Sequence, residues 1–367
     1  MVRRSVRYSL NPRSSLYSLP RLFLFILALG LAACSEPRPE VQMLSGPTMG
    51  TQYHVSWVDT PENTADAESL QEMIRSRLVQ LNKVFSTYDP ESELSILNKK
   101  SADMAGRWIP VSPELMSVLQ DAAFVNGFSL GRFDVTVGPL VNLWGFGPSP
   151  HDVVPTEDEV KALLPSVGMQ HLQLRPASNE IYMDEPLYID LSAIAKGWAV
   201  DDIGLLLENL GISDYLVEIG GEVRTRGTKP SGPWRLAIER PVYESGVSAQ
   251  KIIEPGNHAV ATSGDYRNYF EKDGQRYSHT IDPMTGYPIT HKLASVTVIM
   301  PTCSLADAWA TAIDVAGPEL GMNIAEANHL PVFMLIREDD GFREAYSSAF
   351  KEMFPASADT LKTSEEK

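Results

Sequence analysis

Cysteine is scarce in this sequence: Cys34 and Cys303 are the only two among 367 residues. Two cysteines exclude a disulfide framework and a metal cluster built from several thiolates. The glycine patterns GxGxxG and GxxxxGK[ST] are also missing, which excludes both common nucleotide-binding fingerprints. Internal repeats and low-complexity blocks are absent as well. At this length the chain can bury one large core or two modest ones.

Basic residues are few outside the N-terminus. The whole chain has a formal net charge of −16, but the first 33 residues contain five arginines and no acid. The remainder therefore carries 26 basic and 47 acidic residues, a net charge of −21. Such a surface disfavours binding to nucleic acid and unassisted binding to anionic lipid. Any polyanionic substrate would need a local lysine or a metal ion.

The N-terminal arginines precede an apolar run, Leu22 to Cys34, which is too short to span a bilayer comfortably. The run ends in Leu-Ala-Ala-Cys, which resembles a bacterial lipobox. We therefore interpret residues 1–33 as a lipoprotein signal peptide and Cys34 as the lipidation site. An ordinary signal peptide or an uncleaved anchor is the alternative. Residues 34–45 are polar and contain prolines, which favours a tether, and residues 355–367 are expected to form a flexible tail.

Helical and strand patterns cluster along the chain rather than alternating strictly. Helices are expected at 67–85, after the Ser112-Pro113 cap, after the Thr156 capping box, from about Ser192 to Gly211, and at 304–316. Strands are expected at 48–58, 133–137, up to Asp190, 214–227, 234–240, 258–264, 277–282, 294–300 and 331–338. This clustering predicts an α+β fold with mainly antiparallel sheet.

Asp307 and Thr311 lie four residues apart in a helical pattern, so their oxygens project from one face. An acid and a hydroxyl so placed can form half of an oxygen site for a hard cation. Alternatively, Asp307 is an early-turn acid that the helix dipole favours after a Ser304 cap.

Lys196 lies in the first turns of an expected helix, where a positive charge opposes the helix dipole. A bound phosphate would explain it, because backbone amides at a helix start favour anions. An exposed ion pair with Asp201 is the alternative.

The segment "SHTIDPMTGYP" (278–288) reads as a strand that enters a Pro-Gly turn. His279 within it is either a histidine packed at the strand end or a proton acceptor. An unperturbed imidazole, with a pKa of about 6.5, suits the second role at neutral pH.

Several motifs occur together in one order: "TMGTQY", "FSTYDPESELSILN", "GRFDVTVGPLVNLWGFGP", "DLSAIAKGWAVD", "VEIGGEVRTRG", "AVATSGDYRNYF", "SHTIDPMTGYP" and "ADAWATA". In this respect the sequence resembles the ApbE family, the FAD:protein FMN transferases, from about Gly46 to Arg337. The resemblance implies one domain over 46–354, with two lobes around a flavin-binding cleft. It also implies transfer of the FMN half of FAD to a Thr or Ser hydroxyl of a target protein, with release of AMP.

The resemblance also assigns roles to residues. Asp307 and Thr311 match metal ligands for Mg²⁺, and Ala193 matches a ligand that contributes its backbone carbonyl. His279 matches a histidine near the scissile phosphate, with Asp282 as an alternative proton acceptor. The positions that match FAD contacts are Met49, Tyr88, Arg132, Phe133, Asp134, Asp190, Lys196 and Ile289. For Arg132, we expect a contact through the main chain.

The implied partners are flavoprotein subunits that carry an Asp-Gly-x-Thr-Ser/Thr motif, such as those of Na⁺-translocating quinone reductases. The expected location is the periplasmic side of the inner membrane, held by a lipid anchor. Because Ser35 is not the aspartate of inner-membrane retention, the outer membrane is an alternative. Two other activities fit the same residues: hydrolysis of FAD to FMN and AMP, and non-catalytic FAD binding.

Overall fold

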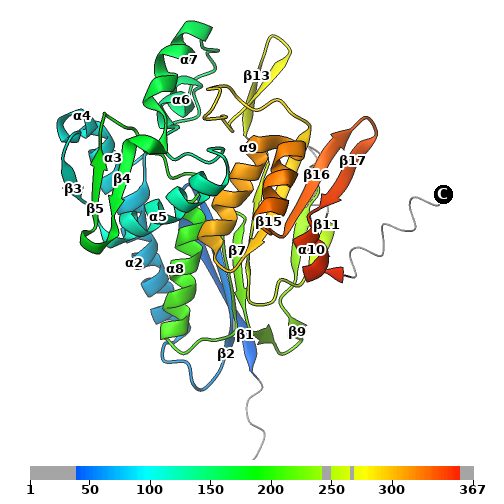
Figure 1. The fold of residues 1–367 in the computed structure, drawn as a ribbon. Helices are drawn as coiled ribbons and strands as arrows, with labels where there is room; N and C mark the ends of the chain where they lie inside the picture. Colours follow the sequence, from blue (N-terminus) through cyan, green and yellow to red (C-terminus); the bar gives the residue numbers. More distant parts are fainter. Residues whose placement is uncertain (1–38, 242–248, 265–267, 356–367) are drawn as a thin grey trace, which may run out of the picture. The chain divides into compact units, whose positions relative to one another are not determined.

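The fold is described from a computed structural model, in which residues 39–241, 249–264 and 268–355 are placed (Figure 1). Contacts divide the chain into two units, Met1–Glu40 and Val41–Lys367, and the second contains the folded domain. The predicted signal peptide, Cys34 and nearly all of the predicted C-terminal tail lie outside the described residues. Among the residues that are described, no helix is both long and apolar enough to cross a membrane.

The main sheet has eight strands, and their order in the sheet is their order along the chain. They are β1 (Glu40–Thr48), β2 (Thr51–Asp59), β6 (Tyr215–Ile219), β7 (Glu222–Arg226), β12 (Ala259–Ser263), β15 (Leu293–Met300), β16 (Val332–Glu338) and β17 (Gly341–Tyr346). From β2 to β17 every neighbouring pair is antiparallel. The expected α+β class with antiparallel sheet is therefore confirmed.

Four smaller sheets lie in the connections between these strands. They are β3-β5-β4 (Trp108–Pro110, Glu180–Met183, Leu172–Arg175), β8-β9 (Thr228–Lys229, Gly232–Pro233), β10-β11 (Leu236–Glu239, Ala249–Ile253) and β13-β14 (Tyr269–Lys272, Gln275–Ser278).

The helices also lie in the connections, except for the last one, which follows β17. They are α2 (Ala67–Phe85), α3 (Glu93–Lys99), α4 (Ser101–Met104), α5 (Pro113–Phe128), α6 (Gly138–Leu143), α7 (Glu157–Leu163), α8 (Ala195–Asn209), α9 (Cys303–Ala327) and α10 (Ser348–Met353), with short 3₁₀ turns at Leu164–Ser166, Met169–His171 and Pro176–Ser178. In Figure 1, α8 and α9 cross one face of the main sheet, and α5 and α2 lie outside them.

Alternation along the central strands builds a core on each face of this sheet. In β12, Ala259 and Ala261 join the large core beneath the helices, whereas Val260 joins a second core. In β16, Met334 faces the first core and Phe333 the second, where α10 and the β10-β11 ribbon cover the sheet. Burial on both faces explains the nearly continuous apolar run of β15.

Several expectations about local structure are wrong. The predicted tether overlaps the sheet, because β1 begins at Glu40. The segments 133–137 and 185–190 contain no assigned strand, although a hydrogen bond from the Asp190 amide to the Val135 carbonyl, at 2.7 Å, joins them. The predicted strand at 48–58 is interrupted by a turn at Met49 and Gly50, which separates β1 from β2.

The last expected helix continues well beyond Ala316. Gly317, with φ 76°, and Pro318 kink α9, and its second half folds back so that Gly321 lies against Ile313. The first half of α9, which carries Asp307 and Thr311, therefore rests on its own second half as well as on the sheet.

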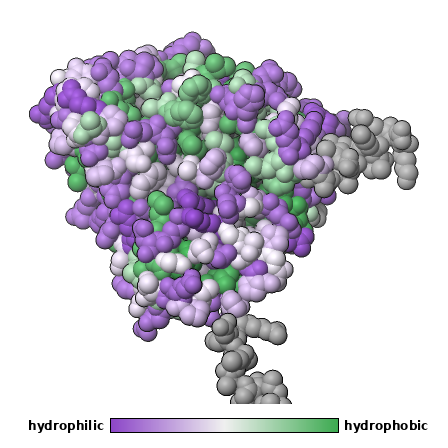
Figure 2. Space-filling model, turned by 60° about the horizontal axis from the view of Figure 1, so that its bottom comes forward, coloured by the Kyte–Doolittle hydropathy of each residue, from purple (hydrophilic) through white to green (hydrophobic). Residues whose placement is uncertain are grey.

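Figure 2 shows the face that is lowest in Figure 1. Hydrophilic residues there are interspersed with small hydrophobic areas, as is usual for the surface of a globular protein.

Candidate active site

The first part of the site is the crossing of α8 over the start of α9. Gly197 permits this crossing, because a Cβ there would lie 2.3 Å from the Cys303 carbonyl oxygen and 2.8 Å from the Asp307 Cβ. The Gly197 amide instead donates a hydrogen bond to Asp307 Oδ2 at 3.1 Å. A glycine thus holds the buried carboxylate of Asp307 directly against the first turn of α8.

Lys196, the residue before this glycine, forms an ion pair with Glu222 at the start of β7. Its Nζ lies 2.5 Å from Glu222 Oε1. The predicted pair between Lys196 and Asp201 is not formed, because Asp201 bonds to Arg224 and to the Ser304 amide. Ser304 is not the cap of α9 either, since Thr302 occupies that position.

The buried acids Asp307 and Glu222 form a charge cluster with the partly exposed Lys196. Burial raises the pKa of Asp307, although Lys196 and the Gly197 amide counteract this. Burial also raises the pKa of Glu222, to about 7, again against the effect of Lys196. Burial alone would lower the pKa of Lys196, but Asp307 and Glu222 raise it above its usual value. One lysine therefore only partly neutralises this cluster.

The donor set of this cluster fits a hard cation. The carboxylate of Asp307 and the hydroxyl of the half-buried Thr311 lie one turn apart on α9, and Ala193 precedes α8 by two residues. Glu222 Oε2 is buried and has no hydrogen-bond partner in the described part of the chain. That part contains no group of three or more His, Cys, Asp or Glu side chains suited to a metal. Hydroxyl and carbonyl oxygens must therefore complete a site here, as Mg²⁺ allows.

A second group of predicted residues lies on loops that are bonded to one another. Asp134 Oδ1 accepts hydrogen bonds from the amide and the hydroxyl of Thr136 at 2.8 and 2.6 Å, and Oδ2 accepts one from the Met169 amide at 2.9 Å. Asp190 Oδ1 accepts bonds from the amide and hydroxyl of Ser192. Both carboxylates thus shape the backbone of these loops.

Tyr88 and Met49 are positioned near these loops and the sheet edge. Tyr88 is two-thirds exposed at 66%, and its pKa is raised by partial burial and by the nearby Asp190 and Tyr188. Met49 has φ 45° in the turn between β1 and β2, where a left-handed backbone is unusual for a side chain of this size. Such strain at the tip of a hairpin often accompanies a functional position.

The third group surrounds the segment after β14. Arg132 forms an ion pair with Asp282, with Nη1 2.7 Å from Oδ2, and Asp282 Oδ1 accepts the Met284 amide. These bonds commit the Asp282 carboxylate, which argues against its role as a proton acceptor. The Phe133 side chain is buried, and the Ile289 amide donates to the Thr280 carbonyl.

His279 follows β14 directly. Its amide and its Nδ1 both lie within hydrogen-bond distance of the Asn268 carbonyl oxygen, at 3.2 and 2.9 Å. Because a carbonyl only accepts, Nδ1 carries the hydrogen, and Nε2 then carries the lone pair. The tautomer that the backbone selects is therefore the one in which Nε2 can accept a proton.

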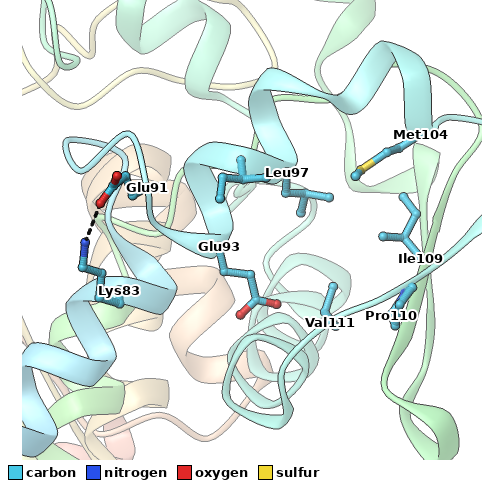
Figure 3. Close-up of a pocket in the computed structure, with 9 residues that line it drawn as sticks. Lys83, Glu91, Glu93, Leu97, Met104, Ile109, Pro110 and Val111 are labelled. Carbon is cyan, nitrogen blue, oxygen red and sulfur yellow. Dashed lines mark hydrogen bonds and ion pairs between the residues drawn. The ribbon is translucent and has the colours of Figure 1, made fainter.

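A surface pocket of about 450 Å³ lies elsewhere, between α2, α3, α4 and β3 (Figure 3). Apolar side chains such as Leu97 and Ile109 line it, and Lys83 and Glu91 pair at its rim. Glu93 points toward it but accepts the amide of Ser112, the cap of α5. None of the predicted site residues lines this pocket, so we assign it no part in the site.

Sequence reasoning missed two residues of this site. Glu222 follows two glycines in "EIGGE", and an acidic side chain at the start of a strand after a tight turn was an available signal. Phe146, whose ring lies edge-on to His279 with the centroids 6.3 Å apart, is part of a quoted motif but was given no role.

Comparisons with known proteins agree with the motif order. The family model "ApbE family" matches residues 49–334. The chain is 49% identical to the FAD:protein FMN transferase of Vibrio cholerae over 324 residues, which cover 88% of this chain and 95% of that protein. The solved flavin transferase ApbE from Vibrio cholerae superposes with a TM-score of 0.78 at 47% identity, over 86% of this chain and 99% of that one. The apo flavinyl transferase ApbE of Pseudomonas stutzeri gives 0.80 at 40% identity, over 88% and 99%.

Proposed function

The chain belongs to the ApbE family, and from this premise we propose that it transfers the FMN moiety of FAD to a Thr or Ser hydroxyl of a target flavoprotein. AMP is the second product. The structural observation that carries this proposal is the charge cluster of Asp307, Lys196 and Glu222, because pyrophosphate chemistry on an acidic protein needs a site for compensating positive charge.

We assign the oxygens of Asp307, Thr311 and the Ala193 carbonyl as the residues that hold Mg²⁺. When bound, the ion would neutralise charge on the FAD pyrophosphate. The buried Asp307 is suited to this role because the Gly197 amide fixes one of its oxygens. Lys196 adds a permanent positive charge beside it, held in place by Glu222.

His279 is the residue we assign to the proton transfer. The acceptor hydroxyl attacks the phosphorus of the FMN phosphate, and its proton passes to Nε2 of His279. A new oxygen–phosphorus bond forms, the bond from that phosphorus to the bridging oxygen breaks, and AMP leaves with the bridging oxygen. The Asn268 carbonyl fixes the required tautomer, because it accepts the hydrogen on Nδ1.

The remaining predicted residues would hold FAD. Arg132 offers its main chain, because its guanidinium is engaged with Asp282. Asp134 and Asp190 hold the loops that carry them and so shape the surface that FAD meets. The full proposed set is Met49, Tyr88, Arg132, Phe133, Asp134, Asp190, Lys196 and Ile289.

The acceptors we propose are membrane flavoproteins with an Asp-Gly-x-Thr-Ser/Thr motif, for example subunits of Na⁺-translocating quinone reductases. We further propose that Cys34 carries the lipid that holds the enzyme on the periplasmic side of the inner membrane. Labelling of the wild type with a radioactive fatty acid, but not of a Cys34→Ala variant, is the expected result. Equal labelling of both chains would refute the anchor.

The activity is tested with the full chain in detergent, FAD, Mg²⁺ and a domain that carries the acceptor motif. AMP release and flavin fluorescence of the denatured acceptor band are followed together. We expect fluorescence that survives denaturation and tracks AMP. AMP without a labelled band would indicate FAD hydrolysis instead, and FAD binding with neither signal would indicate a flavin-holding protein.

The role of His279 is tested by His279→Ala, which should lower the transfer rate by about 10²–10⁴-fold and leave FAD binding intact. His258 is a matched control, because its Nδ1 also lies 2.7 Å from a backbone carbonyl, that of Pro255, in the connection between β11 and β12. His258→Ala should therefore keep its rate. Equal losses in the two variants would show that His279 only supports the fold.

A further inference from the structure

His279 is carried by a hairpin that lies outside the main sheet. Among the described residues, strands β13 and β14 form a two-stranded sheet of their own, and His279 follows β14 at once. An isolated two-stranded hairpin is at best marginally stable in water. The precision that proton transfer requires must therefore come from side chains that pack on this hairpin.

Those side chains belong to a small apolar core that is distinct from the two cores of the main sheet. We call it the hairpin core. Its buried members are Leu140, Trp144, Val160, Val167 and Ile281, and the partly buried residues packed on them include Phe146, Phe270 and Tyr277. They come from α6 and the loop after it, from α7 and the residues just after it, from the hairpin, and from the turn that follows His279. The hairpin core therefore joins the segments on both sides of the histidine.

Within the hairpin core, aromatic rings form a continuous chain that ends at His279. Trp144 stacks on Tyr277 at 5.6 Å between centroids, and Tyr277 stacks on Phe270 at 5.0 Å. Phe270 contacts Phe146 at 5.5 Å, and Phe146 meets the imidazole edge-on at 6.3 Å. At the far end, Trp144 Nε1 donates to the Gly286 carbonyl at 2.8 Å, which ties the chain to the turn 282–288.

We propose that Phe146 is a positioning residue for His279. Its ring contacts the imidazole itself and also Phe270, two residues after Asn268, whose carbonyl accepts the Nδ1 hydrogen. Phe146 thus braces both partners of the bond that fixes the tautomer. The expected effect on kcat rests on the proposed transfer reaction. The expected effect on the imidazole and the hairpin does not depend on that reaction.

The kinetic test uses the full chain with FAD, Mg²⁺ and the acceptor domain. Phe146→Ala should lower kcat for transfer by about 10²-fold, the usual cost of displacing a reacting group by about 1 Å. The FAD dissociation constant, measured by flavin fluorescence, should stay unchanged. Phe146→Tyr keeps the ring and should restore kcat. A loss that appears only in FAD binding, or that Phe146→Tyr fails to restore, would overturn the proposal.

A double-mutant cycle separates positioning from a general effect on the fold. If Phe146 acts through His279, then Phe146→Ala should change the residual rate little once His279 is alanine. Losses that multiply would show that Phe146 acts by another route. Tyr182→Ala is the matched control, because it removes an aromatic contact, 5.5 Å from Trp108, in the separate β3-β5-β4 sheet. It should leave kcat unchanged.

A measurement without turnover decides the structural claim even if the wild type transfers no FMN. The ¹⁵N signals of the His279 imidazole should report a hydrogen on Nδ1 in the wild type and an averaged tautomer in Phe146→Ala. Amide hydrogen exchange over 269–279 should become faster in that variant, while exchange in β15 stays the same. Unchanged imidazole signals and unchanged exchange would refute the bracing role. Absence of transfer by the wild type would refute only the proposed function.

Discussion

The crossing of α8 and α9 predicts a large effect from one added methyl group. In Gly197→Ala the new Cβ would meet the Cys303 carbonyl oxygen at 2.3 Å and the Asp307 Cβ at 2.8 Å. Real Cβ atoms do not tolerate such distances, and neither neighbour is the end of a flexible side chain. The helices must therefore separate, which also stretches the 3.1 Å bond from the residue 197 amide to Asp307.

The expected magnitude has two opposing parts. Overpacking a buried contact costs about 1–3 kcal/mol, and a strained bond to a buried carboxylate adds to that cost. Replacing a helical glycine with alanine returns about 0.5–1 kcal/mol. The net loss in the free energy of unfolding is therefore about 1–2 kcal/mol. Because Asp307 moves with α9, the loss of activity should exceed what this change in stability explains.

The assay compares urea unfolding and FMN transfer in Gly197→Ala and Gly127→Ala. Gly127 also lies in a helix, α5, and a Cβ there would meet nothing within 4 Å. Gly127→Ala should be neutral or more stable by up to about 1 kcal/mol, with normal activity. If both variants unfold at the wild-type midpoint and transfer FMN at the wild-type rate, the proposed constraint at the α8–α9 crossing is wrong.

Three further predictions concern the charge cluster. Burial raises the pKa of Glu222 from 4.5 to about 7, so its contribution to stability is full below pH 4.5 and is lost as pH rises through 7. Glu222→Gln should remove that loss of stability in metal-free protein. The free energy of unfolding in urea is measured for both proteins from about pH 5 to 8, and an equal dependence on pH in the two would contradict the prediction. Lys196→Met should destabilise the metal-free protein by about 3–5 kcal/mol at pH 8, and less at pH 5, because two buried acids lose their base. A smaller loss at pH 8 than at pH 5 would reverse this reasoning. Mg²⁺ at about 100 times its Kd should stabilise the wild type by about 2.7 kcal/mol in thermal unfolding. Asp307→Asn should not be stabilised by Mg²⁺. If Mg²⁺ stabilises this variant as much as the wild type, the ion binds elsewhere.

Local signals in the sequence were enough for many elements. The apolar stripe at 67–85 coincides with α2, and the caps at Ser112 and Thr156 accept the amides that the motifs predict. Asp307 and Thr311 lie on one helix for the same reason, because their relation depends on helical spacing alone. Predictions of this kind succeed since neighbouring residues determine them.

Relations across the chain were not predictable in this way. Glu222 on strand β7 pairs with Lys196 on helix α8, and no local pattern specifies that pair. The buried run before Asp190 reads as a strand, yet packing rather than ladder pairing buries it. In residues 40–48, partly buried positions such as Leu44 alternate with exposed ones, but one proline and several polar residues obscured the strand. The support of His279 by Phe146 needs three segments that only the fold brings together.

Because the order of strands in the main sheet follows the order of the chain, the segments that carry Lys196, His279 and Asp307 are insertions between neighbouring strands. The segment 264–292, which contains His279, leaves from Ser263 and returns just before Leu293, and Ser263 is the register partner of Val296 in the next strand. Partners in antiparallel strands lie about 5 Å apart at Cα. A short turn could therefore replace the whole segment without a change in register, and segments from related enzymes could be exchanged at the same two points. For protein engineering, this architecture separates a scaffold that can stay constant from an inserted segment that can be exchanged.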